Sequence, residues 1–463
     1  MAALAELFSP KDMTVGPPWK RIVEFSLPLL LGNIAQQLYN TVDSIVIGRY
    51  VGDNALAAVG SALPVLHFLL VLFVAVATGA GIMVSQYFGA KDRARLSRSI
   101  GACVTLTAIA STILMLIGPV VIRPMLILIN TPDTIIDWCA DYLLILMLGN
   151  WGFSYFNIFS GILRGLGDSL SALIFLLIST ALNIVLDIWF VAGLNLGVPG
   201  VALATVIAQL LSAVLCAFKL GKMQAIFDFN LNMLKPRKKY LLQLLRLGLP
   251  SGLTQVIFSL AMVTVQSLTN TFGEMIIACN VIVMRVDGFA MMPNFSFGMT
   301  MTTYAGQNVG AKRIDRVELG TRQGLAIAVG VSTVITMIIL LFGRHLMNIF
   351  TGTVALVDLS MRMMRILAAG YIAMAVTQVL AGVMRGAGDT VTPMWLSLIT
   401  TIFLRVPIAY GLAHLTRSPQ FPRGRPESIF VSLLMAWVLG AVVTYVFYRR
   451  GKWKEKALLK DVQ

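Results

Sequence analysis

Charged residues are scarce in this chain. Only 12% of its 463 residues are Asp, Glu, Lys or Arg, whereas 57% are hydrophobic. A soluble protein of this length carries about 25% charged residues to cover its surface, so the composition excludes an ordinary soluble domain. Apolar runs of about 20 residues are long enough, at about 1.5 Å per residue, to cross the hydrocarbon layer of a bilayer. We therefore expect an all-α integral membrane protein.

Cysteine, histidine and common enzyme motifs are rare or missing. The four cysteines show no CxxC spacing and mostly fall in apolar runs, and the three histidines are scattered. This pattern predicts no disulfide, no metal site and no cofactor. No HExxH sequence, P-loop or nucleophile elbow occurs. The N-terminus, Met1 to Glu6, lacks the basic, apolar and cleavable sections of a signal peptide, so we expect the first helix to be retained.

One enzyme motif is present. Gly165-Leu166-Gly167-Asp168 matches the GxGD pattern of intramembrane aspartyl proteases, and the pattern recurs from Gly386 to Asp389. Glycines followed by Asp are also what a helix end and the N-cap of the next helix require. We therefore predict that the protein is not an enzyme, and we keep a protease that uses Asp168 and Asp389 as a remote alternative.

The chain contains the same pattern twice, 221 residues apart. The residues Gln86, Gly89, Ala90 and Lys91 recur as Gln307, Gly310, Ala311 and Lys312. The run from Arg164 to Asp168 recurs from Arg385 to Asp389. Because both halves are strongly apolar, the repeat predicts a membrane protein of two similar lobes, as is common among secondary transporters.

A hydropathy window predicts twelve membrane helices, six in each lobe. Their expected positions are 23–48, 55–86, 98–122, 135–163, 170–192, 198–218, 241–270, 276–306, 319–342, 356–384, 392–414 and 428–448. The chain then divides into a cytoplasmic N-terminal segment (1–22), an N-lobe (23–218), a basic cytoplasmic linker (219–240), a C-lobe (241–448) and a basic cytoplasmic tail (449–463).

The distribution of Lys and Arg predicts the orientation. Most of the 36 basic residues fall in the termini and in the loops that follow even-numbered helices, which places both termini and these loops in the cytoplasm. Six lie in the opposite loops, namely Arg49, Arg123, Arg344, Arg417, Arg423 and Arg425. We expect the basic loops to bind anionic lipid headgroups rather than nucleic acid. The two lobes are then parallel copies, related by a pseudo-two-fold axis along the membrane normal, and a central cavity is expected between them.

Helix 1 carries an unusual polar stripe. An ionisable side chain in hydrocarbon costs about 2.5 kcal/mol or more, so it persists mainly where it faces a partner or a wet cavity. Asp43 lies seven, four and three residues after Gln36, Tyr39 and Asn40, so all four share one helix face. Pro28 either bends this helix or marks its start near Ser26.

Two further helices offer polar residues at helical spacing. Asn183 and Asp187 share a face of helix 5, and Thr205 and Gln209 share a face of helix 6. If the carboxyl groups of Asp43 and Asp187 are close, they cannot both be charged without a proton or a metal ion between them. The alternative is two interfacial carboxylates that reach separately into water. Five more charged residues in the C-lobe helices have no partner by local spacing and are left unassigned, namely Arg285, Asp287, Arg362, Arg365 and Arg405.

The order and spacing of these motifs resemble the multidrug and toxic compound extrusion (MATE) family, DinF-like branch, over nearly the whole chain. The likeness rests on the run from Leu27-Pro28 to Asp43 and Gly48-Arg49, on Asn183 to Asp187, and on both doubled motifs. It implies two six-helix bundles and a V-shaped cleft. In that branch the implied cation-coupling residues are Asp43, Asn183, Asp187 and Thr205, with Tyr39, Tyr142 and Asn157 as neighbouring polar groups and Pro28 as the bend of helix 1.

Another branch, which includes the NorM exporters, uses acidic residues of the C-lobe. Helix 7 of this chain has no acidic residue between Leu241 and Asn270, and Ala375 stands three positions before Gln378. The C-lobe cation site of that branch is therefore not expected here.

The resemblance implies a secondary active antiporter that exports drugs or metabolites in exchange for H⁺ or Na⁺ by alternating access. We expect a monomer in the bacterial inner membrane, with a small organic substrate, membrane lipid as its surroundings, and no cofactor other than the coupling ion. The alternative in the same superfamily is a lipid-linked oligosaccharide flippase. A flippase is expected to carry several basic residues in its cavity for a pyrophosphate, and helices 1, 2, 7 and 8 offer few beyond Arg285.

Overall fold

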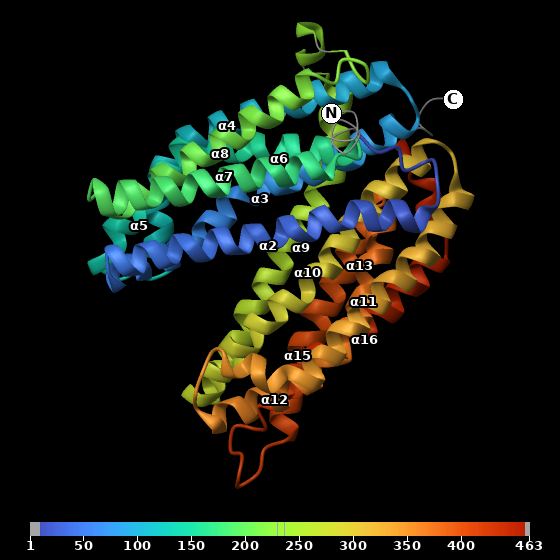
Figure 1. The fold of residues 1–463 in the computed structure, drawn as a ribbon. Coiled ribbons are helices and arrows are strands. Elements are labelled where there is room, and N and C mark those ends of the chain that lie inside the picture. Colours follow the sequence, from blue (N-terminus) through green and yellow to red (C-terminus); the bar gives the residue numbers. More distant parts are fainter. Residues whose placement is uncertain (1–9, 229, 236, 459–463) are drawn as a thin grey trace. The chain divides into compact units, whose positions relative to one another are not determined.

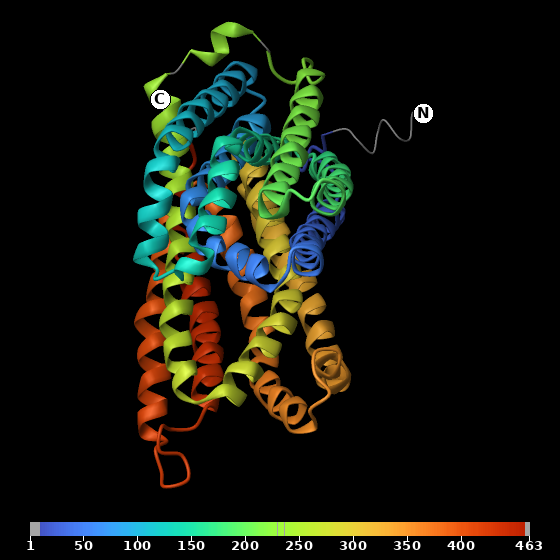
Figure 2. The ribbon, with the colours of Figure 1, turned by 90° about the vertical axis from the view of Figure 1, so that its left-hand side faces the viewer.

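The fold is almost wholly helical, as Figures 1 and 2 show. A computed structural model describes residues 10–228, 230–235 and 237–458. Within these residues there is no β-strand, and a single isolated bridge joins Ser418 and Phe421. The expected all-α class is confirmed. Residues 1–9 of the expected N-terminal segment, 229 and 236 of the linker and 459–463 of the tail lie outside the described residues.

Helices are found at all twelve expected positions, and most extend beyond the expected ends. In the first half these are α2 (Pro18–Tyr50), α3 (Asp53–Gly89), α4 (Arg93–Leu128), α5 (Asp133–Leu148) with α6 (Asn150–Gly165), α7 (Ser169–Ile188) with the π-helix η1 (Trp189–Gly193), and α8 (Gly197–Gly221). In the second half these are α9 (Lys238–Thr271), α10 (Glu274–Gly310), α11 (Ile314–Asn348), α12 (Val354–Ala368) with α13 (Gly370–Gly386), α14 (Val391–Leu398) with the π-helix η3 (Ile399–Leu404) and α15 (Arg405–Leu415), and α16 (Glu427–Arg449). Two short 3₁₀ helices, η2 (Leu231–Leu234) and η4 (Lys452–Glu455), follow α8 and α16.

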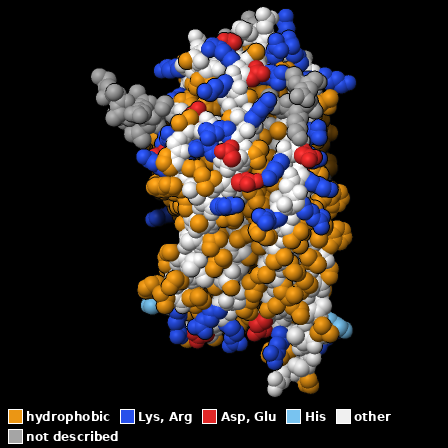
Figure 3. Space-filling view, turned by 90° about the vertical axis from the view of Figure 1, so that its right-hand side faces the viewer, with side chains coloured by type: hydrophobic (Ala, Val, Ile, Leu, Met, Phe, Trp, Pro, Cys, Tyr) orange, Lys and Arg blue, Asp and Glu red, His pale blue; other side chains and the backbone are white. Residues whose placement is uncertain are grey.

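The helices are long and apolar enough to span a membrane. Among the described residues, nine qualify by length and composition alone, or eleven if two bent pairs are each one span. The bent pairs are α5 with α6, at 54°, and α12 with α13, at 44°. On the face drawn in Figure 3, Lys and Arg lie over the upper half and at the lower end, and hydrophobic side chains cover the band between them. The chain is therefore a multi-pass membrane protein.

The chain divides into two compact units, which we call the N-lobe unit and the C-lobe unit. The N-lobe unit comprises residues 1–12 and 27–252, and the C-lobe unit comprises residues 13–26 and 253–463. The boundary between the units crosses α2 beside Pro28 and α9 beside Pro250, so one part of each helix belongs to each unit. Because α2 begins at Pro18, Pro28 lies inside the helix and does not mark its start.

Each unit has its own hydrophobic core. In the N-lobe the core is built around buried side chains such as Ile47, Phe73 and Leu143. In the C-lobe the corresponding core includes Val283 and Leu367. Burial of apolar surface of this kind contributes about 25 cal/mol per Å².

A glycine three residues before each Arg-Gly-x-Gly-Asp motif lets two helices of the lobe pack closely. A Cβ added to Gly161 in α6 would lie 2.5 Å from the carbonyl oxygen of Ala77 in α3. A Cβ added to Gly382 in α13 would lie 2.3 Å from the carbonyl oxygen of Gly298 in α10. Both partners of the second pair lie 221 residues after those of the first. The same backbone contact is therefore built twice, and only glycine allows it.

The Arg-Gly-x-Gly-Asp motif itself lies where one helix ends and the next begins. Gly167 and Gly388 have φ values of 91° and 98°, which favour glycine, and each follows the end of a helix. Asp168 then accepts hydrogen bonds from the backbone and the hydroxyl of Ser171, at 2.9 and 2.7 Å. Asp389 accepts one from the backbone of Thr392 at 3.2 Å. The expected helix end is confirmed at both places, and Asp168 is the expected N-cap of α7. At the second place Thr390 is the N-cap of α14, and Asp389 bonds the first turn from one residue earlier.

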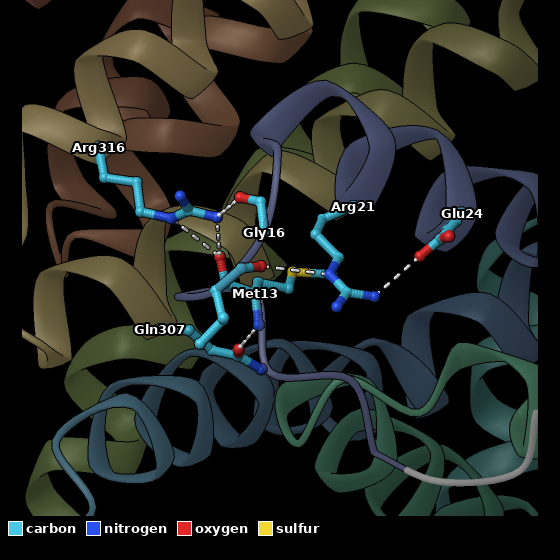
Figure 4. A network of polar contacts seen from close by, with 7 residues as sticks. Met13, Gly16, Arg21, Glu24, Gln307 and Arg316 are labelled. Atoms are coloured by element: carbon cyan, nitrogen blue, oxygen red, sulfur yellow. Dashed lines mark hydrogen bonds and ion pairs between the residues drawn. The ribbon is translucent and has the colours of Figure 1, made fainter. Parts of the chain in front are cut away.

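A segment ahead of the first membrane helix is attached to the C-lobe unit (Figure 4). We call residues 13–17 the N-terminal strap. The backbone nitrogen of Met13 donates to Oε1 of Gln307 at 2.8 Å, and the Asn308 amide donates to the carbonyl of Met13 at 3.2 Å. The Arg316 guanidinium also donates to the carbonyls of Met13 and Gly16. The second copy of the Gln-x-x-Gly-Ala-Lys motif therefore anchors the strap.

The N-lobe unit holds a strap of its own, formed by the linker that follows α8. Arg93, at the start of α4, donates to the carbonyls of Gln224 and Ala225 at 2.6 and 3.0 Å. It also pairs with Asp228 at 2.7 Å. Thr105 donates to the carbonyl of Leu234 at 2.7 Å. Each unit therefore has an arginine near the start of its third long helix, Arg93 on α4 or Arg316 on α11. Each arginine binds the chain segment that leads into the helices of the other lobe.

We expect Arg316→Ala to release the N-terminal strap. The side chain makes charge-assisted hydrogen bonds to Met13 and Gly16, each worth about 1.5–3 kcal/mol. Local opening of the segment should rise by roughly tenfold or more. The readout is the rate of tryptic cleavage after Lys20, which is exposed, in detergent-purified protein. Arg322→Ala, on the exposed face of the same helix, is the matched control, and equal cleavage rates in the two variants would contradict the assignment.

Candidate ion-coupling site

The predicted coupling residues of the N-lobe lie on three helices. Asp43 lies on α2, Asn183 and Asp187 lie on α7, and Thr205 lies on α8. All three helix segments belong to the N-lobe unit. Asn183 and Asp187 are fully buried, with 0% exposure, and Thr205 is 6% exposed. Asp43 is half-buried.

The two predicted carboxyl groups lie near each other. Asp43 and Asp187 are close enough to interact electrostatically. The burial of Asp187 excludes the alternative in which both carboxylates reach separately into water. Like charges at this separation and burial strongly repel, so the pair is stable only with a proton or a cation between the two groups.

Two tyrosines complete the cluster. The hydroxyl of Tyr39, which is 5% exposed, lies beside that of Thr205 and within electrostatic range of both carboxyl groups. Tyr142 on α5 is also 5% exposed and also faces Asp43 and Asp187. Both hydroxyl groups can donate to a carboxylate or offer a neutral oxygen to a cation.

The cluster is rich in buried polar atoms without partners. Buried groups in proteins are almost always hydrogen-bonded, so each exception requires an explanation. Within the part of the chain that the structure describes, no hydrogen bond reaches the buried atoms Tyr39 Oη, Asp43 Oδ1, Asn183 Nδ2 and Oδ1, Asp187 Oδ1 and Oδ2, and Thr205 Oγ1. The concentration of so many unsatisfied oxygens in one place is typical of a site whose ligand is a small positive ion.

The donor set restricts the ion that would fit. Hard cations prefer carboxylate, amide, hydroxyl and carbonyl oxygens, which are the groups present here. Among the described residues, no group of three or more His, Cys, Asp or Glu side chains gathers as a transition-metal site would. Two carboxyl groups with neutral oxygens suit a proton or Na⁺.

The other predicted polar residues surround the cluster less closely. Gln36 and Asn40 are exposed on α2, and Gln209 is half-buried on α8. Asn157 on α6 is half-buried, and its amide donates to the carbonyl of Phe153 at 2.9 Å. Helical spacing therefore placed Gln36 and Asn40 on the stripe of Asp43, but the packing of α2 leaves them outside the buried part.

The two Asp residues of the GxGD sequences have structural roles. Asp168 caps α7, and its buried carboxylate also pairs with Lys219 at 3.6 Å. Asp389 is 6% exposed and caps the start of the eleventh span. Each is bonded within its own lobe, so neither has the free carboxyl group that a protease would need.

A second group of ionisable residues lies in the C-lobe, and it includes Asp287 and Arg405, which the sequence left unassigned. The half-buried Asp287 on α10 lies within electrostatic range of Tyr371 on α13 and of Arg405 on α15. These residues lie on three helices that are far apart in sequence. Local spacing could not bring them together, and only their isolated charges inside apolar helices signalled them.

Comparison with known proteins identifies the family of the chain. The sequence profile of the MatE family matches residues 28–189 and 250–411. The probable multidrug resistance protein YoeA of Bacillus subtilis (strain 168) is 28% identical over 453 residues, which cover 96% of this chain and 96% of that protein. The multidrug export protein MepA of Staphylococcus aureus (strain N315) is 22% identical over 375 residues, which cover 81% of this chain and 82% of that protein.

Solved structures share the fold over nearly the whole chain. One is described as the outward-facing conformation of a multidrug resistance MATE family transporter of the MOP superfamily. It superposes with a TM-score of 0.89 at 24% identity and covers 96% of this chain and 99% of that chain. Because the family profile spans both halves, the chain belongs to the MatE family of membrane transporters and is not an enzyme.

Proposed function

We propose that this transporter is an antiporter that exports organic compounds in exchange for H⁺ or Na⁺, which binds at the N-lobe carboxyl pair. The observation that carries the proposal is that Asp43 and Asp187 interact electrostatically amid buried polar atoms that have no hydrogen-bond partner among the described residues. These carboxyl, amide and hydroxyl groups hold a small cation tightly only when the helices that carry them lie close together. Movement of α2 against α7 therefore changes the affinity for the ion.

Coupling requires that the ion distinguish two states of the protein. A ligand with equal affinity for both states does not change their populations. A change of the population ratio from 1:99 to 99:1 requires that the ligand bind the two states with affinities that differ by about 10⁴-fold, or about 5.5 kcal/mol. Binding of an ion between the buried carboxyl group of Asp187 and the half-buried one of Asp43 supplies energies of this order, because two like charges without the ion repel strongly. The transport cycle is alternating access, in which the ion gradient biases the exchange.

The proposed substrates are drugs or metabolites of varied shape. The relatives named above are a multidrug resistance protein and a multidrug export protein, which supports a broad range of organic compounds. The absence of acidic residues from α9 between Leu241 and Asn270 supports coupling through the N-lobe, as in the DinF-like branch. Lys and Arg are concentrated in the termini and in the loops that follow even-numbered helices. This distribution supports a location in the bacterial inner membrane, with both termini in the cytoplasm.

The test is transport by the purified protein in liposomes. With a fluorescent organic cation or an unlabelled metabolite mixture on one side, we expect movement only when a pH or a Na⁺ gradient of the opposite direction is imposed. Separate arms with each gradient identify the ion, and an ionophore that dissipates the effective gradient should stop transport. Equal transport with no gradient of either kind would refute exchange and indicate a passive pathway.

A further inference from the structure

The chain passes from one unit to the other at three places. Two of these crossings lie within the helices α2 and α9, beside Pro28 and Pro250, where a proline allows a helix to bend. The third lies between Asp12 and Met13, in a stretch without secondary structure. This third crossing has no hinge, so it can follow a movement of the units only by straightening or by detaching.

On the C-lobe side of this crossing, the N-terminal strap is firmly attached. Met13 is completely buried, and its backbone nitrogen donates to Oε1 of Gln307 at 2.8 Å. The guanidinium of Arg316 donates to the carbonyl of Met13 at 3.2 Å, as Figure 4 shows. The guanidinium of Arg313 donates to the carbonyl of Thr14 at 3.1 Å. Charged donors make hydrogen bonds about twice as strong as neutral donors do, so these contacts hold the strap to the C-lobe unit.

On the N-lobe side of the crossing, the chain is attached to the Arg-Gly-x-Gly-Asp motif. The backbone nitrogen of Lys11 donates to the carbonyl of Gly167 at 3.3 Å. The carbonyl of Lys11 also passes so close that a Cβ added to Gly167 would lie 2.2 Å from it. Both residues belong to the N-lobe unit. The glycine of the motif therefore leaves the space in which the chain ahead of the strap is held.

The two attachments lie two residues apart in the sequence. An extended chain spans at most about 3.6 Å per residue, so Lys11 and Met13 can be separated by about 7 Å at most. While both attachments hold, Gly167 in the N-lobe unit and Gln307 in the C-lobe unit cannot move apart beyond what this length allows. We call residues 11–13 the tether.

The tether joins two motifs that each lie at the end of a membrane helix. Gly167 follows the end of α6, and Gln307 lies in the last turn of α10. When two rigid units rock against each other, the ends of their helices move further than the middles. A short tether at the helix ends therefore restrains such a movement more effectively than one near the middle of the helices would.

We propose that the tether is a latch, which must detach at one of its two attachments before these helix ends of the two units can separate. This inference rests on the proposed alternating access, in which the two sides of the transporter open in turn. The latch stabilises the state in which these ends stay together, because its hydrogen bonds are lost when it detaches. It thereby sets part of the equilibrium between the two states.

A longer tether tests the proposal without removing either attachment. Insertion of Gly-Ser-Gly-Ser between Asp12 and Met13 of the full-length protein adds about 14 Å of reach. Spin labels at Ala94→Cys and Asp315→Cys, two exposed positions in different units, report the separation. The four native cysteines are buried and should stay unlabelled. Pulsed electron paramagnetic resonance in lipid nanodiscs then gives the distribution of distances between the labels.

We expect the insertion to increase the population with the longer distance by roughly threefold or more, since the loss of one net hydrogen bond changes an equilibrium by about this factor. Equal distributions with the short and the long tether would overturn the proposal. The matched control is the same insertion between Pro419 and Gln420, in an exposed loop of the C-lobe unit, which should give the wild-type distribution. An equal change in this control would show a general loosening and contradict the latch.

A substitution approaches the same restraint from its C-lobe attachment. Arg316→Ala keeps the length of the tether but weakens the hold on Met13, so it should also increase the population with the longer distance. Arg322→Ala, on the exposed face of the same helix, should not. A change with the insertion but none with Arg316→Ala would mean that the strap contacts do not carry the restraint, and the latch would be wrong.

The latch and the proposed antiport can fail independently. The distance measurement uses neither a substrate nor an ion gradient, so failure of gradient-driven transport in liposomes would leave its result unchanged. Asp43→Asn should show the same difference between the short and the long tether as the wild type does. If the difference vanished in that variant, the separation would depend on the carboxyl pair rather than on the tether, which would contradict the latch.

Discussion

Asp43→Asn is expected to abolish transport driven by an ion gradient while leaving a folded, membrane-inserted protein. The amide keeps the size of the side chain, but it removes the charge that would hold the ion against Asp187. Once the ion no longer distinguishes the two states, the gradient has no effect on the direction of transport. We expect the initial rate in liposomes to fall by roughly 100-fold or to the level of protein-free liposomes, since a loss of about 2.7 kcal/mol of bias suffices for such a decrease.

The matched control is Asp141→Asn. Asp141 is an exposed carboxylate on α5, in the same lobe and adjacent in sequence to Tyr142, so it tests the loss of one negative charge alone. It should transport at the wild-type rate. Asp187→Asn should behave as Asp43→Asn does, because each variant removes half of the same pair. Normal gradient-driven transport by either of these two variants would remove the carboxyl pair from the mechanism.

Transport without a gradient gives a second readout for the same variants. Exchange of labelled for unlabelled substrate across the bilayer does not require a bias between the two states. If Asp43→Asn retains this exchange and loses only the gradient-driven component, the residue acts in ion coupling. If both are lost although the protein is folded by circular dichroism, Asp43 also contributes to substrate binding or to the conformational change.

Much of the fold follows from local features of the sequence. Apolar length locates the helices because each must cross the same thickness of hydrocarbon. The ends of α6 and α13 follow from Gly167 and Gly388, whose positive φ values suit glycine, and from the Asp residues that cap the next helices. These signals are local, so a single sequence is sufficient to interpret them.

The start of α2 was not predictable in the same way. Hydropathy places the start of α2 near residue 23, yet the helix begins at Pro18. The first turns of α2 belong to the C-lobe unit and are too polar for a hydropathy window to detect. The fixed φ of proline suits the first turn of a helix, so Pro18 is a favourable residue for the start of α2.

The candidate site was partly predictable. Spacing grouped Asp43 with Tyr39 on α2 and Asn183 with Asp187 on α7, and the structure brings these helices together. Spacing alone does not show how wide the buried face is, so Gln36 was grouped with Asp43 although it is exposed. The roles of these residues stay predictions.

The C-lobe cluster shows the limit of local inference. Asp287, Tyr371 and Arg405 lie on three different helices, and each lacks a charged neighbour at helical spacing. Their proximity depends on how α10, α13 and α15 pack, which one sequence does not reveal. A lone charge in an apolar helix predicts only that some partner exists.

Gly382→Ala is expected to destabilise the C-lobe severely. The added Cβ would lie 2.3 Å from the carbonyl oxygen of Gly298, a distance that real side chains do not adopt. The opposing atom is backbone, so it cannot rotate away, and α13 must separate from α10, the helix with which it packs most extensively (Figure 1). Overpacking of this kind typically costs about 1–3 kcal/mol, and more where no side chain can yield. We expect the melting temperature in detergent to fall by roughly 5–10 °C.

Gly330→Ala is the matched control for this effect. Gly330 lies within α11, and a Cβ there would meet no atom within 4 Å. Alanine favours the helix over glycine by about 0.5–1 kcal/mol, so the control should be neutral or slightly stabilised. Gly161→Ala should reproduce the destabilisation in the N-lobe, because its Cβ would lie 2.5 Å from the carbonyl oxygen of Ala77. If Gly382→Ala and Gly330→Ala melted at the same temperature, close backbone contact would not be the reason that the glycines of the repeat recur 221 residues apart.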